Sequence, residues 1–456
     1  MNNDKKHDIK TMPLDYHRQL ANAFFAPIAN KPWSMLLRSA SSAHPDSRYD
    51  ILVAQPIATL VTIDNQTTIK VGQSVKRSAD DPFTLIQQQV NSLLPTVSNN
   101  NLNLPFIGGA LGYFGYDLGR RVESLPNLAE KDIDAPDMAV GIYDWAIIVD
   151  HQEQKACMVG DNLNFHLRWL QSQQQTQDTF ELTSSWHSNM SKQSYTAKFD
   201  KVMGYLLSGD CYQINLAQRY HAQYKGSLWQ AYQQLEHHNQ APFSAFIQLE
   251  NATVLSVSPE RFLQIQDQNI ETKPIKGTRP RSNNKIQDMA NASSLATAEK
   301  DQAENLMIVD LLRNDIGRVA EPGSVDVPAL FQIESFPAVH HLVSTVTAKL
   351  DSNFSAMDCL RACFPGGSIT GAPKVRAMEI IEELEPHRRN IYCGSIGYIS
   401  RCGKMDTSIT IRTLVAENDS IYAWAGGGLV ADSNAESEYQ ETIDKLSKIL
   451  PILENL

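Results

Sequence analysis

The chain has 456 residues, 42% of them hydrophobic and 20% charged, which is long enough for one large domain or for two to three smaller ones. Its 51 acidic and 40 basic residues give a formal charge of −11, which excludes broad electrostatic binding to nucleic acid or to an anionic membrane. The sequence contains no apolar leader, no run of about 18 apolar residues, and no CxxC or zinc-type spacing among its six cysteines, so we expect a cytoplasmic protein with free thiols.

The N-terminal region, residues 1–175, is predicted to form a mixed sheet with covering helices. Strand-like runs at residues 51–54 and 146–149 are separated by Gly and Pro and by a polar loop. Residues 171–177 are rich in glutamine and form the most linker-like segment. We therefore place a boundary there and expect a second region over residues 189–456.

A carboxyl group at the end of a predicted strand is the first candidate for acid–base chemistry. Glu260 follows the strand-like residues 253–257 and precedes Arg261. If its pKa is raised, Glu260 could act as a general acid. A salt bridge between Glu260 and Arg261 is the alternative, and the residues alone favour it.

Lys276 lies where a short apolar stretch, Pro274-Ile275, meets Gly277. An amine at such a position is either a plain surface charge or a nucleophile. It becomes a nucleophile if partial burial lowers its pKa toward neutrality, because enough of the amine is then unprotonated to attack carbon. The residues around it leave both possibilities open.

The segment after Lys276 is predicted to contain a helix and a strand. Residues 295–312 lack Gly and Pro and carry several apolar residues, so most of them are expected to be helical, with Glu304 on that helix. His340 and His341 precede apolar residues in a predicted strand, where adjacent side chains point to opposite faces, so at most one should line a site. Two cysteines with helical spacing are expected in the core, namely Cys359 and Cys363.

Two glycine-containing segments, residues 366–374 and 426–428, could bring backbone amides close to a ligand, and an ordinary turn is an equal alternative for each. The first segment leads into a predicted helix with Pro373 in its first turn. It is not a phosphate-binding P-loop, because Ala and Pro separate its last glycine from its lysine. Residues 408–413 alternate like a strand with Arg412 on one face, where it could hold a carboxylate or form a cross-strand pair.

The last helix is predicted to begin at about residue 435 and to carry two carboxylates on one face. Glu438 and Glu441 lie three residues apart, so their side chains are close and repel each other. A solvated face is the commoner explanation, and a shared Mg2+ is the other, because Mg2+ favours carboxylates. Glu304 could join them only if the fold brought the two helices together. The inward-facing residues of this helix are expected to be Tyr439, Ile443, Leu446 and Leu450.

Taken together, six blocks of the sequence resemble the chorismate-utilising enzyme family, and the resemblance covers nearly the whole chain. In family order, the blocks are residues 208–216, 258–262, 274–278, 310–315, 364–374 and 438–442. The resemblance implies a large α/β (α+β) fold in which two packed β-sheets form a sandwich surrounded by helices. It also implies that residues 1–175 are similar to the N-terminal region of anthranilate synthase component I, and that the chorismate site lies in a cleft of the C-terminal region.

Lys276 stands where the anthranilate synthases carry Ala, and the family members with Lys make 4-amino-4-deoxychorismate. The resemblance implies that Lys276 attacks C2 of chorismate while Glu260 protonates the departing C4 hydroxyl, and that ammonia then adds at C4 and expels the lysine. Thr278 is expected to hydrogen-bond near the reacting ring. Isochorismate synthases carry a Lys base where Gln213 stands here, and Gln cannot deprotonate water, which argues against that reaction.

The resemblance also implies the rest of the site. Mg2+ would lie among Glu304, Glu438 and Glu441 and bind the ring carboxylate of chorismate. His341 would face the ring, and the enolpyruvyl carboxylate would be held nearby. The substrate-binding residues implied in this way are Arg412, Tyr392, His341, Gln213, Gly426, Gly427 and Gly428.

Two further features follow from the resemblance. Related enzymes have a buried pocket that binds tryptophan. In this chain the matching residues could form such a pocket, or they could simply pack together as part of the core. The residues that match it by position are Ser39, Asp46, Ser47, Arg48, Tyr49, Pro242, Phe243 and Ser244. The chain has no credible Cys-His-Glu glutaminase region, so the resemblance implies a separate glutamine amidotransferase subunit that delivers ammonia. A separate lyase would then yield 4-aminobenzoate, the folate precursor.

Two other functions are considered. One is that of an anthranilate synthase large subunit, which Lys276 disfavours. The other is that of a catalytically silent, tryptophan-binding regulatory module. Such a module would be expected to lose Lys276, Glu260 or the pair of Glu438 and Glu441, and all of these residues are present.

Overall fold

The strands form two large antiparallel sheets in the computed structural model, which describes residues 8–41, 44–95, 97, 102–175, 178–336 and 339–456. The first sheet contains, in spatial order, β1 (Lys10–Leu14), β10 (Lys155–Gly160), β9 (Trp145–Asp150), β3 (Tyr49–Val53), β2 (Met35–Arg38), β14 (Phe243–Gln248), β15 (Thr253–Ser258), β24 (Thr413–Glu417), β25 (Ser420–Leu429), β13 (Gln213–Lys225) and β11 (Glu181–Leu182), with β12 (His187–Ser188) and β21 (Gly371–Ala372) also paired to β13. The second contains β18 (Ile275–Pro280), β20 (Val339–Lys349), β17 (Asn269–Thr272), β16 (Arg261–Gln266), β23 (Met405–Ile409), β22 (Ser395–Ser400), β7 (Gly109–Phe114), β8 (Met138–Tyr143), β4 (Ala58–Ile63), β5 (Gln66–Val71) and β6 (Ser74–Ser78), with β19 (Asp326–Ser335) beside β20.

The two sheets pack face to face through apolar side chains, and the first sheet has a second apolar face that packs against helices. In β3, Ile51 and Val53 belong to the large core that spans both sheets, whereas Leu52 belongs to a second core on the other face of the first sheet. Tyr143 of β8 bridges the sheets, since its hydroxyl donates a hydrogen bond to the carbonyl oxygen of Trp33 at 2.9 Å. The predicted fold, an α/β protein with two packed sheets surrounded by helices, is confirmed.

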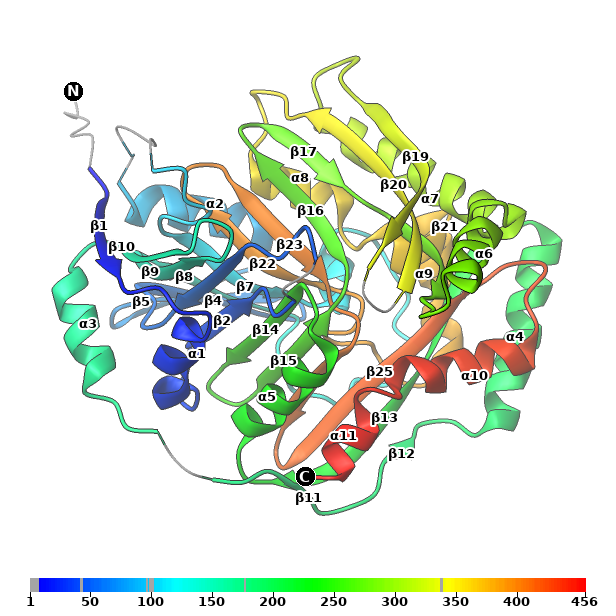
Figure 1. The fold of residues 1–456 in the computed structure, drawn as a ribbon, viewed down its shortest axis with the longest axis horizontal. Coiled ribbons are helices and arrows are strands. Elements are labelled where there is room, and N and C mark those ends of the chain that lie inside the picture. The colour runs from blue at the N-terminus through cyan, green and yellow to red at the C-terminus, as the bar shows by residue number, and fades with distance from the viewer. Residues whose placement is uncertain (1–7, 42–43, 96, 98–101, 176–177, 337–338) are drawn as a thin grey trace.

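Helices cover the outer faces of both sheets (Figure 1). The helices next to the first sheet are α1 (Leu20–Phe25), α3 (Leu163–Gln171), α5 (Leu228–Asn239), α10 (Ala435–Leu446) and α11 (Leu450–Glu454), with α4 (Lys192–Ser208) and α9 (Lys374–Leu384) beside β13. Those next to the second sheet are α2 (Pro82–Leu93), α6 (Lys285–Ala296), α7 (Glu299–Gly317) and α8 (Ala356–Cys363). Three short 3-10 turns are η1 (Ala26–Ile28), η2 (Tyr116–Arg121) and η3 (Gly367–Ile369).

Both sheets contain strands from both ends of the chain. In the first sheet β2 pairs with β14, and in the second β7 pairs with β22, so blue and green or orange strands lie side by side in Figure 1. The expected boundary at residues 171–177 starts at the last residue of α3 and precedes β11, although residues 176 and 177 lie outside the described residues. The division into regions 1–175 and 189–456 stays a prediction.

Several local predictions are confirmed. Residues 51–54 and 146–149 fall in or at the ends of β3 and β9, and the last long helix begins at Ala435. Cys359 and Cys363 are fully buried on α8, and all six cysteines are free. No helix in the described part of the chain is long and apolar enough to cross a membrane.

Two helix predictions are wrong in part. Residues 295–312 contain a break, because Ala298 adopts an extended backbone and caps the start of α7. Two carboxylates in the first turn of α7, Glu299 and Asp301, favour a new helix start through the helix dipole. Ile443 was expected to face inward, but it is 39% exposed, whereas Leu446 on the same helix is buried.

Candidate active site

Lys276 projects from β18 beside a β-bulge. The register of β18 against β20 shifts between Lys276 and Thr278, and Gly277 at the shift has a φ of 75°. A side chain at Gly277 would be crowded as well as strained, since a Cβ atom there would lie 2.8 Å from side-chain atoms of Leu295 and Asp301. The glycine therefore fixes the local path of the strand that carries Lys276.

The amine of Lys276 lies among polar atoms from two other elements. Its Nζ forms an ion pair with Oε1 of Glu304 on α7 at 2.7 Å, and donates to the carbonyl oxygen of Ser368 at 3.4 Å. Only 14% of the lysine side chain is exposed. Gln213 of β13 also donates to Oε1 of Glu304, at 2.8 Å. Lys276 is thus a half-buried amine inside a polar cluster, and not a plain surface charge.

Glu260 lies at the junction of β15 and β16 and faces η3, the turn that carries Ser368. Its Oε1 accepts a hydrogen bond from the hydroxyl of Ser368 at 3.4 Å. Burial raises the pKa of Glu260 to about 7, although the charges of Lys276 and Lys445 and the hydrogen bond from Ser368 oppose the rise. A carboxyl with such a pKa is suited to proton transfer near neutral pH.

The alternative of a salt bridge between Glu260 and Arg261 is wrong. Arg261 instead pairs with Asp46 at 2.6 Å and with Asp406 at 2.9 Å. Its guanidinium also lies over the ring of Phe243. Because these partners already neutralise the guanidinium, Glu260 is left facing the site.

The three carboxylates expected to hold a metal meet adjacent glycines of β25. A Cβ atom built on Gly427 would lie 3.1 Å from Oε2 of Glu438 and 3.7 Å from Oε1 of Glu441, and one on Gly428 would lie 3.2 Å from Oε1 of Glu304. Burial raises the pKa of Glu438, and the charge of Glu441 adds to that rise. Glycine at these positions is what lets the carboxylates approach the strand.

Each of these carboxylates has a partner of its own. Glu304 pairs with Lys276, Glu441 pairs with Lys445 at 2.7 Å, and Glu438 accepts a hydrogen bond from Ser433 at 2.7 Å. Within the described ranges, no group of three His, Cys, Asp or Glu side chains is arranged so that it could hold a metal ion. The two glutamates of α10 and the one of α7 are near the same strand without converging on one point.

Arg412 does not lie on a strand, which corrects the prediction for residues 408–413. β23 ends at Ile409 in the second sheet and β24 begins at Thr413 in the first, so the chain crosses between the sheets here. Arg412 makes this crossing with a φ of 50°. Burial lowers its pKa, and no acidic side chain of the described residues pairs with it. A guanidinium held in this way can accept a carboxylate ligand.

Thr278 and His341 form the wall next to Arg412. The Thr278 hydroxyl and the Nδ1 of His341 are hydrogen-bonded at 2.9 Å. Burial and the charge of Arg412 lower the pKa of His341 to about 4, so this imidazole is neutral at physiological pH. His340 points away and contacts Ser335, as the strand alternation predicted.

Tyr392 is buried, with 3% of its surface exposed. Its ring stacks on Trp424 with centroids 6.2 Å apart, and the guanidinium of Arg389 lies 5.7 Å from its ring centroid. Burial raises its phenol pKa well above the usual value. The structure therefore joins Lys276 to Glu304 and, through Ser368, to Glu260, and it places Glu438 and Glu441 beside a glycine of β25.

Comparison with known proteins identifies the family of the chain. A model of the family described as chorismate binding enzyme matches residues 35–451. The chain belongs to this family.

The chain is 57% identical over 446 residues to the aminodeoxychorismate synthase component 1 of Klebsiella aerogenes, covering 97% of this chain and 98% of that protein. The protein of the same name from Escherichia coli (strain K12) is 57% identical over 445 residues, with the same coverage. Among solved structures, anthranilate synthase component I from Streptococcus pneumoniae TIGR4 aligns with a TM-score of 0.79 and 31% identity, over 88% of this chain and 92% of that chain.

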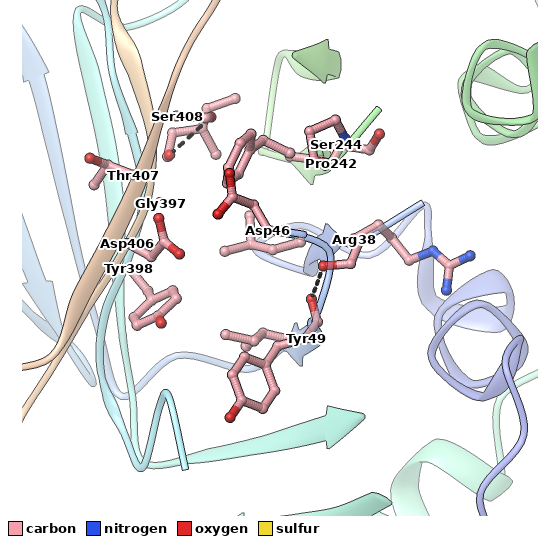
Figure 2. A pocket seen from close by; sticks show the side chains of 16 residues that line it. Arg38, Asp46, Tyr49, Pro242, Ser244, Gly397, Tyr398, Asp406, Thr407 and Ser408 are labelled. Atoms are coloured by element: carbon pink, nitrogen blue, oxygen red, sulfur yellow. Dashed lines mark hydrogen bonds between the residues drawn. The ribbon is translucent and has the colours of Figure 1, made fainter. Parts of the chain in front are cut away.

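This chorismate-binding chain also has a cavity where the tryptophan pocket was expected. The cavity, of about 70 Å3, lies between the two sheets, with residues of both around it (Figure 2). The predicted residues that line it are Ser39, Asp46, Tyr49, Pro242, Phe243 and Ser244. Ser47 and Arg48 were also expected there but do not line it, and Arg48 instead pairs with Asp150. Its remaining lining includes Gly397, Tyr398, Asp406, Thr407 and Ser408.

Ser368 and Arg389 were not predicted from the sequence as components of the site. Ser368 lies inside the glycine-containing segment 366–374, which was considered only for its backbone amides. Its contacts with Glu260 and Lys276 join residues 108 and 92 positions away along the chain. Such contacts depend on the tertiary fold, so the sequence offered no signal beyond the segment itself.

Proposed function

We propose that this chain converts chorismate and ammonia into 4-amino-4-deoxychorismate, as an aminodeoxychorismate synthase component 1. One observation carries the proposal: an amine and a protonatable carboxyl contact the same residue. Nζ of Lys276 and Oε1 of Glu260 each lie 3.4 Å from an atom of Ser368. The high identity to relatives of that name favours this reaction over anthranilate formation. Anthranilate formation would require ammonia itself to attack C2, where Lys276 is expected to react.

The reaction would proceed through a covalent lysine intermediate. Lys276 must first lose a proton, and the nearest acceptor is Glu304 at 2.7 Å. The free amine then forms a bond to C2 of chorismate, the two ring double bonds shift, and the C4 hydroxyl leaves as water after taking a proton from Glu260. In the second half, ammonia adds at C4, the double bonds shift back, and the bond between C2 and the lysine breaks.

A magnesium site is part of the proposal. Mg2+ would supply positive charge for the ring carboxylate of chorismate in an otherwise acidic protein. The chemistry of these side chains suits such an ion, although the three carboxylates do not converge on one point in this structure: burial raises the pKa of Glu438, and Glu441 and Glu304 approach the neighbouring backbone. All three are oxygen ligands of the kind Mg2+ prefers. Glu304 would have to exchange its contact with Lys276 for the ion.

The remaining substrate contacts are proposed from the same cluster. Arg412 would hold the enolpyruvyl carboxylate, together with backbone amides of residues 426–428, while Tyr392 supports that wall from behind. The neutral imidazole of His341 would face the ring and keep Thr278 oriented. Gln213 would orient Glu304, to which it donates a hydrogen bond.

The relatives are named component 1 of aminodeoxychorismate synthase, so a partner is part of the proposal. We propose a glutamine amidotransferase subunit that releases ammonia to this chain in the cytoplasm, and a separate lyase that converts the product into 4-aminobenzoate for folate. L-tryptophan is proposed as the occupant of the cavity between the sheets.

Product analysis tests the proposal directly. The purified chain would be given chorismate, MgCl2 and ammonium at mildly alkaline pH, and the products separated by chromatography. We expect 4-amino-4-deoxychorismate. Accumulation of anthranilate would assign the chain to the other reaction, and no turnover even with an amidotransferase subunit added would overturn the enzymatic proposal.

A further inference from the structure

Ser368 contacts both residues that the proposed reaction needs. Its hydroxyl donates to Oε1 of Glu260, and its carbonyl oxygen accepts from Nζ of Lys276, each at 3.4 Å. Ser368 is half-buried in the short turn η3, between β18 and the junction of β15 and β16. The two groups that it contacts have different roles in the proposed reaction: Glu260 gives a proton to the substrate, and Lys276 forms a bond to carbon.

The turn that carries Ser368 is fixed from behind by buried hydrogen bonds. The Thr370 hydroxyl donates to the carbonyl oxygen of Gly366 at 3.0 Å, and the Asn215 amide donates to the carbonyl oxygen of Thr370 at 2.9 Å. Ile369, the residue after Ser368, has its carbonyl oxygen bound by Nη1 of Arg389 at 3.1 Å. The turn is therefore held on both sides of the serine.

Arg389 connects the turn to β13 and to two buried aromatic rings. This fully buried guanidinium pairs with Glu385 through Nε and Nη2, at 2.9 and 2.7 Å, and donates to the carbonyl oxygen of Asn215 at 2.7 Å. It also lies over the rings of Tyr116 and Tyr392. The planar, five-donor shape of Arg allows these simultaneous contacts, and Lys could not reproduce them. Arg389 touches neither Lys276 nor Glu260, so it can act only through the turn.

We infer that Ser368 is a positioning residue that holds the acid Glu260 and the nucleophile Lys276 in one geometry, and that Arg389 keeps its turn in place. The inference rests on the proposed function, because it assigns Ser368 a role only in a reaction that uses both groups. A serine that only occupies a position in a turn would have no such effect on the acid and the nucleophile.

The electrostatic consequence of removing the hydroxyl has a definite sign. Glu260 is faced by the ammonium groups of Lys276 and Lys445 and by the Ser368 hydroxyl, and each of these lowers its pKa, against burial, which raises it. In Ser368→Ala the hydrogen bond to the carboxylate is lost while both lysines remain. The pKa of Glu260 then rises further, and the acid stays protonated to a higher pH.

The test compares Ser368→Ala with Ser368→Thr, which keeps a hydroxyl. For Ser368→Ala we expect about a tenfold lower kcat, a KM for chorismate within about twofold of the unmodified protein, and an alkaline limb of the kcat/KM profile displaced to higher pH. Ser368→Thr should restore the limb. Ser78→Ala removes a hydrogen bond between a hydroxyl and a carboxylate on the surface, to Asp80, and should leave the profile unchanged.

The outcomes separate this inference from the proposed function. If the unmodified chain forms 4-amino-4-deoxychorismate but Ser368→Ala leaves kcat and the alkaline limb unchanged, the role of Ser368 is refuted. If the unmodified chain makes a different product, the proposed function fails first.

Arg389→Lys gives a second, independent measurement. We expect it to lower kcat and to displace the alkaline limb in the same direction as Ser368→Ala, because the turn loses its anchor. A lower melting temperature with an unmoved pH profile would reduce Arg389 to a structural residue and overturn its part of the inference.

Discussion

At the scale of single residues, Glu260 is held where its neutral form is favoured. Burial raises the pKa of its carboxyl to about 7 against the opposing effect of Lys276 and Lys445. A general acid must be protonated when substrate binds, so the rate should fall as the pH rises through this value. We predict that kcat/KM decreases above about pH 7, and that Glu260→Gln lowers it by at least about 100-fold at every pH.

The control for Glu260 is Glu250→Gln, which removes an exposed carboxylate paired with Lys70 and should leave activity unchanged. A profile that stays level across neutral pH, in the unmodified chain, would remove Glu260 as the acid.

Lys276 is predicted to be the residue that becomes covalently attached to substrate. Incubation with chorismate and Mg2+ without ammonia should trap an adduct, because the second half of the reaction cannot proceed. Intact-protein mass spectrometry should detect this adduct in the unmodified chain and not in Lys276→Ala. The matched control is Lys273→Ala, three positions earlier, whose ammonium lies 3.9 Å from Glu271 and should leave the adduct intact. An adduct that persists in Lys276→Ala would identify another nucleophile.

Sequence reasoning at this scale succeeded where a local pattern decided the outcome. Strand alternation correctly separated His340 from His341. It failed for Arg261, whose partners Asp406 and Asp46 are 145 and 215 residues away. A charge beside Glu260 in the sequence suggested a salt bridge, but only the fold determines which carboxylate an arginine reaches.

At the scale of secondary-structure elements, α10 carries the two glutamates proposed to bind Mg2+. Glu438 is buried against β25, whereas Glu436, one half-turn earlier, is exposed and pairs with Lys192. We predict that Glu438→Gln weakens Mg2+ and chorismate binding together, because the ion and the ring carboxylate would share one site. Titration calorimetry with each ligand provides the measurement.

Glu436→Gln is the matched control on the same helix, since it removes one carboxylate without touching β25. It should bind both ligands normally. Unaltered Mg2+ dependence in Glu438→Gln would exclude that glutamate from the metal site.

The bulge in β18 is a second element-scale requirement. Gly277→Ala would force a side chain into a positive φ and against Leu295 and Asp301. We predict that it destabilises the chain by about 1 to 3 kcal/mol and lowers kcat, because the strand that positions Lys276 must shift. Gly403→Ala has a similar positive φ but open space around the added atom, so it isolates the backbone cost. Urea denaturation compares the two, and equal losses of stability with full activity in Gly277→Ala would contradict the role of the bulge.

Helices and strands were predictable where caps or apolar spacing mark them, as at the start of α10, which Asn434 caps with its side chain. The crossing of the chain between the two sheets at Arg412 was not predictable from the sequence. Its alternating residues suit a strand, yet a non-glycine residue adopts φ of 50° there so that the chain can pass from one sheet to the other. Tertiary packing supplies the free energy for that conformation, and no local pattern reports it.

At the scale of the whole molecule, the two sheets meet around the cavity and the active site at once. Asp46, in the turn before β3, and Asp406 of β23 both line the cavity, and both pair with Arg261, the neighbour of Glu260. The ion pairs of Arg261 with Asp46 and Asp406 therefore connect the cavity to Glu260, the proposed acid. Its aromatic and carboxylate lining suits a ligand that has both a ring and an ammonium group.

The proposed occupant, L-tryptophan, can be tested by its effect on folding. A ligand that binds only the native state raises the melting temperature as its concentration increases. We predict such a rise with L-tryptophan, measured by thermal unfolding. Ser244→Met should abolish it, because the longer side chain would occupy space that Ser244 now lines.

The matched control is Arg48→Met, which alters a neighbouring residue that pairs with Asp150 and does not line the cavity; its melting temperature should still respond to L-tryptophan. If the unmodified chain shows no rise at any concentration, the cavity is a packing feature of the interface between the sheets. If the rise occurs and the alkaline limb of kcat/KM stays in place, tryptophan stabilises the two sheets without reaching Glu260. Because Arg261 is the shared partner of Asp46 and Asp406, a displaced limb would instead mean that the ligand acts on the acid through that arginine.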